Sequence, residues 1–263
     1  MIQRILTAYY AECLKAIRWK FSYLGPVLVV AMVLFAPLVQ PIQRDGSGDY
    51  GFIAFATPMA LNLLGLILLL SFCACLVSSE TASGTIRLVL VRPILRHEYL
   101  AAKFLLGLSY ALLLTVMTAV TSWVLVALFG DLSGVEYGGE VLYTGTQMAT
   151  TYFFGILLTL APQAAAVAYA IFISVVTRST GASVGASIGI WVVLDAVKYP
   201  LHIAPILFST YFETPWQVFT NRCSGIEATW TPGIYGCLGA SLGSFAVFTI
   251  LSAIILRRRN LQG

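Results

Sequence analysis

The chain has 263 residues, of which 59% are hydrophobic and 10% charged, and its mean hydropathy is +0.89. A soluble domain carries about 25% charged residues, so this composition excludes a soluble globular protein and predicts a surface that mostly faces lipid. The formal net charge of +4 is interpreted as a signal of membrane orientation and gives no argument for nucleic-acid binding.

Residues 1–20 have the pattern of an amphipathic helix that precedes the first apolar run. One side carries residues at helical spacing, namely Ile2, Ile5, Tyr9, Cys13 and Ile17. We expect this helix to lie in the cytoplasmic membrane interface as an elbow, with Trp19 at the membrane entrance. The alternative is an ordinary cytoplasmic extension of the first span. The segment is too long for the basic start of a signal peptide, so no cleavage is expected.

Six apolar stretches follow, at 21–42, 52–77, 104–129, 152–176, 183–197 and 233–256. A membrane-spanning helix needs about 20 such residues, and a barrel would show alternating polarity instead. The predicted fold class is therefore an all-α integral membrane protein whose transmembrane domain covers residues 21–256. The fifth span is short and ends at Lys198-Tyr199-Pro200, before a second apolar piece at 201–208. We predict that it is broken near one membrane face.

Most of the 15 Lys and Arg residues fall on one side of this arrangement. They lie in residues 1–20, in the stretch 78–103, at Arg178 and in the basic tail 257–263. The positive-inside rule then places both termini in the cytoplasm. The longest segment on the other side is the predicted external loop 209–232.

Two features of the fifth span are candidates for helix contacts and for function. Gly181, Gly185 and Gly189 recur every four residues and form a face that another helix can approach closely, either within this chain or in a second copy. Asp195 and Lys198 are three residues apart and can pair on one helix face. The pair is either a functional intramembrane charge pair or an interfacial pair that marks the end of the helix.

The five cysteines do not indicate a disulfide framework. A bridge between Cys223 and Cys237 and two free thiols are both open readings. No Lys follows a Gly, so a phosphate-binding P-loop is excluded, and Ala101 stands where the HExxH zinc motif beginning at His97 needs its second His. No GxSxG motif is present. We predict no catalytic residue, no metal site and no cofactor bound by this chain.

The unusual stretch is ETASGTIRLVLVRPILRHEYLAAK, residues 80–103, which is charged although it lies between two uncharged runs. Glu80 stands where the second span leaves the membrane, Gly84 permits a sharp change of direction, and Thr85 can cap a short helix. That short element is apolar, is broken by Pro93 and is surrounded by arginines, and the stretch ends at Lys103. Such a compact amphipathic surface is what docking to a partner requires. The docking arginines are Arg87, Arg92 and Arg96.

This stretch resembles the signature of ABC-2 type permeases. The matching positions are Glu80, Gly84, Thr85, Leu88 (or Val89), Pro93, Arg96 and Lys103. The likeness is strongest to the six-span group that includes the nitrous-oxide-reductase maturation permease and bacterial multidrug or antibiotic exporters. The chain end, Arg258-Arg259-Asn260-Leu261, is similar to the family's RRDL, with Asn260 in place of the acid.

The resemblance implies a permease in the bacterial plasma membrane, paired with a second copy of itself and with two cytoplasmic ATPase subunits that bind ATP and Mg. In that family the charged stretch forms coupling helices that seat in a groove of the ATPase, with Glu80 and Gly84 here as the pivot. The first and fifth spans face the partner permease, which would put Gly181, Gly185 and Gly189 at the dimer interface. Export is the expected direction.

Two rival functions remain open at this point. A secondary carrier would need acids deep in broken helices, and only Asp195 qualifies. A mechanotransmitter would use the same ATPase-driven motion to act on an external partner protein without transport. The apolar spans fit a lipid-like cargo, but every such protein has apolar spans, so the substrate stays open.

Overall fold

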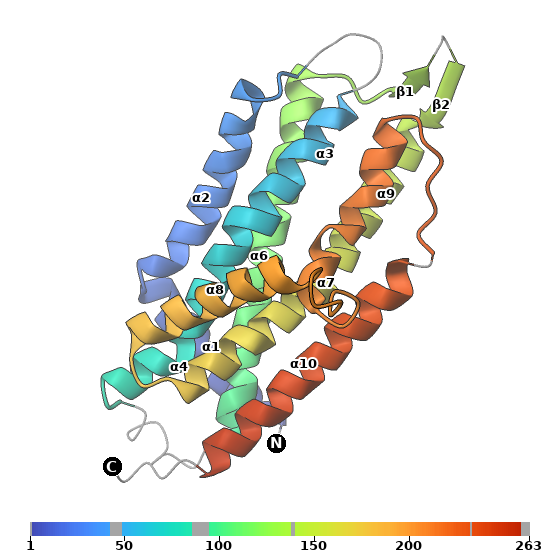
Figure 1. Ribbon diagram of the computed structural model, residues 1–263. Coiled ribbons are helices and arrows are strands. Elements are labelled where there is room, and N and C mark those ends of the chain that lie inside the picture. Colours follow the sequence, from blue (N-terminus) through green and yellow to red (C-terminus); the bar gives the residue numbers. More distant parts are fainter. Residues whose placement is uncertain (1, 43–48, 86–94, 138–139, 232, 259–263) are drawn as a thin grey trace.

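The computed structural model describes residues 2–42, 49–85, 95–137, 140–231 and 233–258 (Figure 1). Its elements in chain order are α1 (Ile2–Arg18), α2 (Phe21–Phe35), the 3₁₀ turn η1 (Ala36–Leu38), α3 (Tyr50–Pro58), the π-helical turn η2 (Met59–Gly65), α4 (Leu66–Ala82), α6 (Arg96–Phe129), β1 (Gly134–Tyr137), β2 (Glu140–Thr144), α7 (Gly145–Val176), α8 (Thr180–Val197), the 3₁₀ turn η3 (Phe208–Phe212), α9 (Thr214–Cys223) and α10 (Gly233–Arg258).

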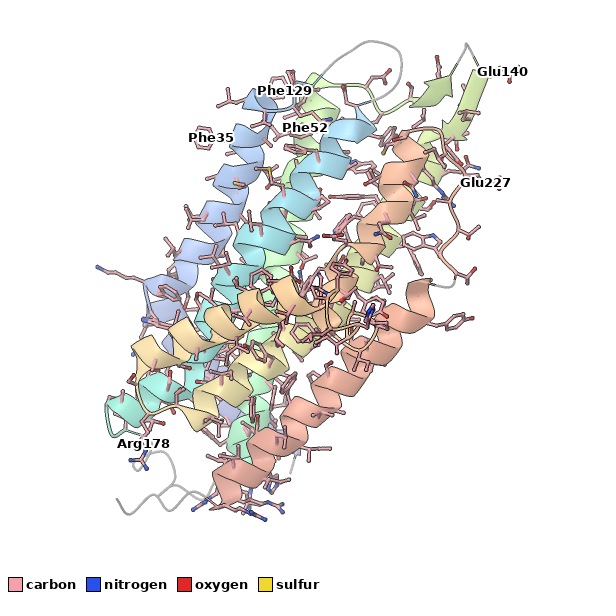
Figure 2. The ribbon with its side chains drawn as sticks, in the orientation of Figure 1. Phe35, Phe52, Phe129, Glu140, Arg178 and Glu227 are labelled. Carbon is pink, nitrogen blue, oxygen red and sulfur yellow. The ribbon has the colours of Figure 1, made fainter. Side chains whose placement is uncertain are left out.

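The predicted fold class is confirmed, because six helices are long and apolar enough to cross a membrane. They cover Phe21–Leu38, Tyr50–Ala82, Arg96–Phe129, Gly145–Val176, Thr180–Val197 and Gly233–Arg258. These helices form one bundle (Figure 1). Figure 2 shows Glu140 and Glu227 near the end of the bundle opposite Arg178.

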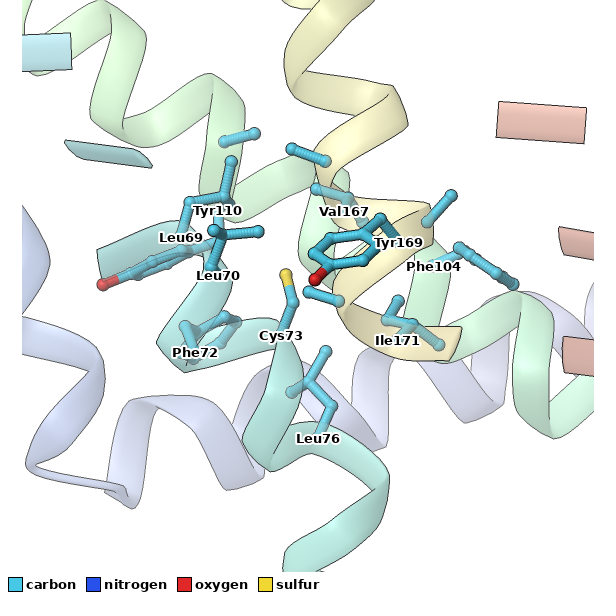
Figure 3. Packing of buried hydrophobic residues seen from close by; sticks show 14 of the residues in the cluster. Leu69, Leu70, Phe72, Cys73, Leu76, Phe104, Tyr110, Val167, Tyr169 and Ile171 are labelled. Atoms are coloured by element: carbon cyan, nitrogen blue, oxygen red, sulfur yellow. The ribbon is translucent and has the colours of Figure 1, made fainter. Parts of the chain in front are cut away.

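The second span is one helix of three parts and supplies the centre of the bundle. Pro58 lacks an amide hydrogen, and the chain continues through it with the wider η2 turn before α4 begins. Side chains on all sides of α4 are buried from Leu66 to Ser78. Figure 3 shows Leu69, Leu70, Phe72, Cys73 and Leu76 of this helix packed among residues of α6 and α7. The rings of Phe72 and Tyr110 stack with their centroids 3.9 Å apart.

The half of the bundle away from α1 has its own aromatic core. Tyr50 and Phe52 from α3, Tyr152 from α7, and Trp216 and Phe219 from α9 are all buried there. Within the predicted external loop 209–232, α9 therefore packs into the bundle against α3 and α7. The loop between α6 and α7 forms a short antiparallel hairpin of β1 and β2.

The fifth span ends at Val197, at the predicted break. Turns follow, and His202 adopts a positive φ of 54°. The second apolar piece enters η3 at Phe208 and does not continue the helix. Figure 1 shows that α8 ends partway along the bundle, below the level that α2, α3, α6 and α7 reach. The elements η3 and α9 fill the remaining length.

A glycine allows a close contact between three helices in the inner core. A Cβ atom built at Gly107 of α6 would lie 2.6 Å from Val167 Cγ1 and 3.1 Å from Cys73 Sγ. A carbon at the first distance would overlap a branched side chain that cannot swing away. Helices α4, α6 and α7 therefore meet at a point where only glycine fits.

Gly107→Ala should lower the stability of the protein relative to Gly239→Ala. Both changes gain the same helix propensity, about 1 kcal/mol, but a Cβ at Gly239 of α10 meets no atom within 4 Å. Overpacking at Gly107 should make the difference between the two variants about 1–3 kcal/mol. Thermal unfolding in detergent, followed by tryptophan fluorescence, measures this difference. Equal midpoints would contradict the close packing at Gly107.

Candidate functional site

Helix α1 has three faces, which explains how it lies at the base of the bundle. Its contact face is formed by Ile5, Ala8, Tyr9, Glu12, Cys13 and Ala16, which are buried or half-buried. A second face is apolar and exposed, with Leu6, Tyr10, Leu14 and Ile17. A third carries Arg4, Thr7, Lys15 and Arg18. Such a helix can pack on protein, lipid and water at once, as an interfacial elbow does. Ile17 was predicted on the same side as Tyr9 but lies on the exposed apolar face.

A cluster of four charges joins α1, the end of α4 and the start of α6. The Lys103 ammonium donates to Glu12 Oε2 at 2.5 Å and to Glu80 Oε1 at 2.8 Å. Lys15 donates to Glu12 Oε1 at 2.7 Å and to Glu80 Oε1 at 3.0 Å. The Tyr99 hydroxyl donates to Glu80 Oε2 at 2.6 Å. We call these five residues the base clamp.

The base clamp is electrically balanced, and apart from the half-exposed Lys15 its charged side chains are largely buried. The side chain of Lys103 is 2% exposed, and those of Glu12 and Glu80 are 8% and 11% exposed. Two carboxylates face two ammonium groups, so the hydrogen-bonding groups compensate one another, which a buried charge requires. The Lys103 ammonium also lies 5.3 Å from the centre of the Tyr99 ring. Partial burial alone would lower the pKa of Lys15, but hydrogen bonding and attraction to Glu12 and Glu80 raise it.

The base clamp holds both ends of the charged stretch predicted to dock a partner. At one end, Gly84 turns the chain with a positive φ of 71°, as expected for a sharp change of direction. The Thr85 hydroxyl lies 2.9 Å from Ser83 Oγ. At the other end, the buried Glu98 accepts from the Leu95 backbone amide at 3.1 Å. Residues 86–94, with Arg87, Arg92, Pro93 and the short helix that Thr85 is expected to cap, lie outside the described residues.

Arg96, one of the predicted docking arginines, also has a contact within the chain. Its Nη1 donates to the backbone carbonyls of Leu256 at 2.7 Å and Arg257 at 3.0 Å. These are terminal carbonyls of α10, which lack partners within their own helix, and a cation there also interacts favourably with the helix dipole. Arg96 is the first residue of α6, and its side chain thus connects the start of that helix to the end of α10.

A cavity of about 510 Å³ opens beside the base clamp. Glu12, Glu80 and Lys103 line it together with Trp19 and Phe72. The cavity lies between α1 and helices α4 and α6, so one side of the base clamp borders unfilled space. Within the part of the chain that the structure describes, no group of three or more His, Cys, Asp or Glu side chains is placed to hold a metal ion.

The glycine face of α8 points away from the rest of its own chain. A Cβ at Gly181, Gly185 or Gly189 would meet no described atom within 4 Å. The opposite side of α8 packs on α4, where the Ser183 hydroxyl donates to the Ala74 carbonyl at 2.8 Å. Among the described residues, then, the glycine face is not used for packing within the chain.

The remaining candidates are placed as follows. Lys198 Nζ lies 2.7 Å from Asp195 Oδ1, so the predicted pair forms, at the end of α8 and thus partway along the bundle. All five cysteines are free, and Cys237 is fully buried, so the possible bridge from Cys223 to Cys237 is absent.

Three clamp residues, Glu12, Lys15 and Tyr99, were not among the predicted site residues. Glu12 was the available signal, because it is an acid on the helix face that also carries Tyr9 and Cys13. Tyr99 lies four residues before Lys103, on the same side of α6. Neither spacing indicates that the partner is Glu80.

The chain matches one family model, described as ABC-2 family transporter protein, over residues 8–194. The match extends from α1 into α8 and includes every residue of the base clamp. No curated protein matches the chain.

Lys103→Met should destabilise the protein by about 3–5 kcal/mol, because it leaves two buried carboxylates with a single, half-exposed cation. Thermal or denaturant unfolding in detergent measures the loss, with Lys20→Met, at an exposed position, as the control.

A double variant separates charge balance from lost packing. Lys103→Met combined with Glu80→Gln leaves Glu12 and Lys15 as a balanced pair, so it should be more stable than Lys103→Met alone. A single variant as stable as Lys20→Met would show that the base clamp contributes nothing to folding.

Proposed function

The chain belongs to the ABC-2 family of transporter proteins, and we propose that it is the permease subunit of an ATP-driven exporter whose ATPase is a separate cytoplasmic protein. The observation that carries this proposal is the base clamp. It ties both ends of an arginine-bearing stretch to three helices through buried ionic contacts. A surface loop that only connects two spans needs no such support.

The clamp gives a route for motion from the docking stretch into the membrane. A displacement of residues 86–94 acts on α4 through Glu80 and on α6 through Lys103. Glu12 passes the same displacement to α1, and Arg96 passes it to α10. Short buried contacts transmit a rigid-body shift, whereas the positive-φ turn at Gly84 lets the docking stretch change its angle. The partner supplies the energy, and this chain supplies the element that moves.

The proposed setting follows from the same end of the molecule. Two ATPase subunits would bind ATP and Mg and dock on residues 86–94 from the cytoplasm, in the bacterial plasma membrane. This orientation agrees with the positions of Arg178 and the end of α10 at the clamp end and of Glu140 and Glu227 near the opposite end (Figure 2). The chain itself would bind no nucleotide.

We propose that a second copy of the chain covers α2 and α8. In the most apolar part of these spans, 22% of the residues of α2 and 11% of those of α8 are buried, against 78% for the second span. Because α10 is also only 11% buried, low burial by itself does not select the interface, and the glycine face of α8 carries the argument. On α8 the uncovered face is the glycine face, which permits the close backbone approach typical of membrane helix pairs.

Charge reversal at Arg87 and Arg92 should abolish ATPase binding. Affinity purification of the chain from native membranes in mild detergent, followed by mass spectrometry, should recover an ATPase near one-to-one with the wild type. Arg87→Glu with Arg92→Glu should lose it, whereas Arg4→Glu with Arg18→Glu, on the polar face of α1, should keep it. Arg96 is left intact because its loss would also release α10. Recovery of no ATPase with either protein would overturn the proposed function.

Gly185→Leu should weaken dimerisation roughly tenfold or more, because a branched side chain prevents close approach of α8 to its partner. The monomer fraction in liposomes, measured by single-molecule photobleaching over a dilution series, gives the affinity. Ala246→Leu adds the same bulk on an exposed face of α10 and should leave it unchanged. Wild-type dimerisation of Gly185→Leu would remove the glycine face from the interface.

A further inference from the structure

A second cavity, of about 400 Å³, lies on the side of the bundle where α8 breaks. It is bounded by Tyr169 of α7, by Trp191 and Leu194 of α8, by the segment Ile206–Ser209, and by one face of α10 from Gly239 to Phe248. Its volume falls within the roughly 300–1,000 Å³ of small-molecule sites. None of its walls belongs to the base clamp or to the glycine face of α8.

The wall on α10 is kept open by glycine. A Cβ at Gly239 or Gly243 would meet no described atom within 4 Å, so these positions border empty space. From Gly239 to Phe248 the helix rises roughly 13 Å at 1.5 Å per residue. The long, narrow and almost wholly apolar wall matches an extended hydrocarbon chain better than a compact ligand.

Two hydrogen-bond donors at the cavity have no partner among the described residues. Ser209 is only 7% exposed, and its hydroxyl is unpaired. The indole Nε1 of Trp191 is also buried and unpaired. Buried polar groups are normally satisfied, and a tryptophan nitrogen can only donate. A bound molecule that satisfies both groups therefore needs an acceptor oxygen.

The break in α8 supplies a polar environment near the same place. Asp195 and Lys198 form their ion pair next to the lining residue Leu194, and Tyr199 and His202 follow in the turns. The polar part of an amphiphile can lie at this break while its chain runs along α10. Charged groups beside the cavity, unpaired donors and an apolar wall are the three kinds of contact that the headgroup, ester and acyl chain of a glycerophospholipid can use.

We propose that this cavity binds one acyl chain of a membrane phospholipid, with the ester carbonyl accepting hydrogen bonds from Ser209 and Trp191. The chain lies against Gly239 and Gly243 of α10. The lipid would fill the space between α8 and α10 and satisfy donors that the protein leaves unpaired. This site is independent of ATPase docking and of the proposed direction of transport.

The test uses the full chain in nanodiscs of phosphatidylethanolamine and phosphatidylglycerol that contain a trace of phosphatidylglycerol with a diazirine in one ester-linked acyl chain. After illumination, adducts are mapped by mass spectrometry. We expect them to concentrate at residues 239–248 and 206–209, well above those on the exposed apolar side of α6 at Val116 and Val120. Gly243→Leu, which fills the cavity, should lower this labelling several-fold, and Ala246→Leu should not.

The acceptor is tested by a second comparison, between the ester-linked probe and its ether-linked analogue, which lacks the carbonyl. In the wild type the ether probe should label the cavity roughly two- to tenfold less, the range expected for lost hydrogen bonds. Ser209→Ala with Trp191→Phe should label weakly and equally with both probes. Because these changes are small, preserved labelling of the exposed side of α6 shows that the variant is folded.

Two results would overturn the proposal. Labelling of residues 239–248 that equals that of the exposed side of α6 and is unchanged by Gly243→Leu would show ordinary lipid contact only. Labelling that is absent in the dimer and arises only in the monomer would show that a second copy covers the cavity. Loss of ATPase binding in the purification experiment would leave both of these readouts unchanged, so the two proposals fail separately.

Discussion

The architecture of the end of the bundle that holds the base clamp depends on the burial of one ammonium group. Lys103 is almost fully enclosed, so the fold must bring it carboxylates, and they come from two different helices. This requirement fixes α1 against the bundle and sets the end of α4 beside the start of α6. A hydrophobic contact could hold the same helices, but it would tolerate sliding. An ionic contact with defined hydrogen-bond directions does not.

The rest of the bundle is organised around that fixed end. Helix α4 is buried on all sides between α6, α7 and α8, so it can move only with its neighbours. Farther along the same span, Pro58 and the π-helical turn interrupt the regular backbone pattern. The inner core is thus a compact unit joined to an aromatic outer core through an irregular turn. Proline residues and π-helical turns are common locations for bending in helices, so the second span can bend where the two cores meet.

The sequence allowed prediction of the features that depend on local composition. Six apolar runs predicted six spans, because the preference of a helix for lipid is a property of its own residues. The break after Val197 was also predictable from local residues, because the charge of Lys198 and the proline at position 200 interrupt the apolar helix. Pairing at a distance was not predictable. Glu12 and Lys103 are 91 residues apart, and nothing near either residue specifies the other.

The aromatic core in the outer half of the bundle also depends on contacts between residues that are far apart in the sequence. Trp216 and Phe219 lie within the predicted external loop, and their burial against Tyr152 depends on the packing of α9 on α3 and α7. Arg96 was interpreted as a docking charge because it belongs to the arginine-bearing stretch between two uncharged runs. Its contact with α10 involves backbone carbonyls, and a backbone acceptor leaves no trace in residue type.

The bond from Arg96 to the Leu256 carbonyl spans 160 residues and also bears on how the protein is made. Synthesis proceeds from the N-terminus, so α1, α4 and α6 can assemble the base clamp long before α10 has been inserted. The first residue of α6 acquires this contact only when the final helix arrives. A chain that stalls or is cut before α10 would therefore display the docking stretch on an unsecured helix. The docking surface is therefore fully supported only after α10 has been inserted and has formed its contact with Arg96.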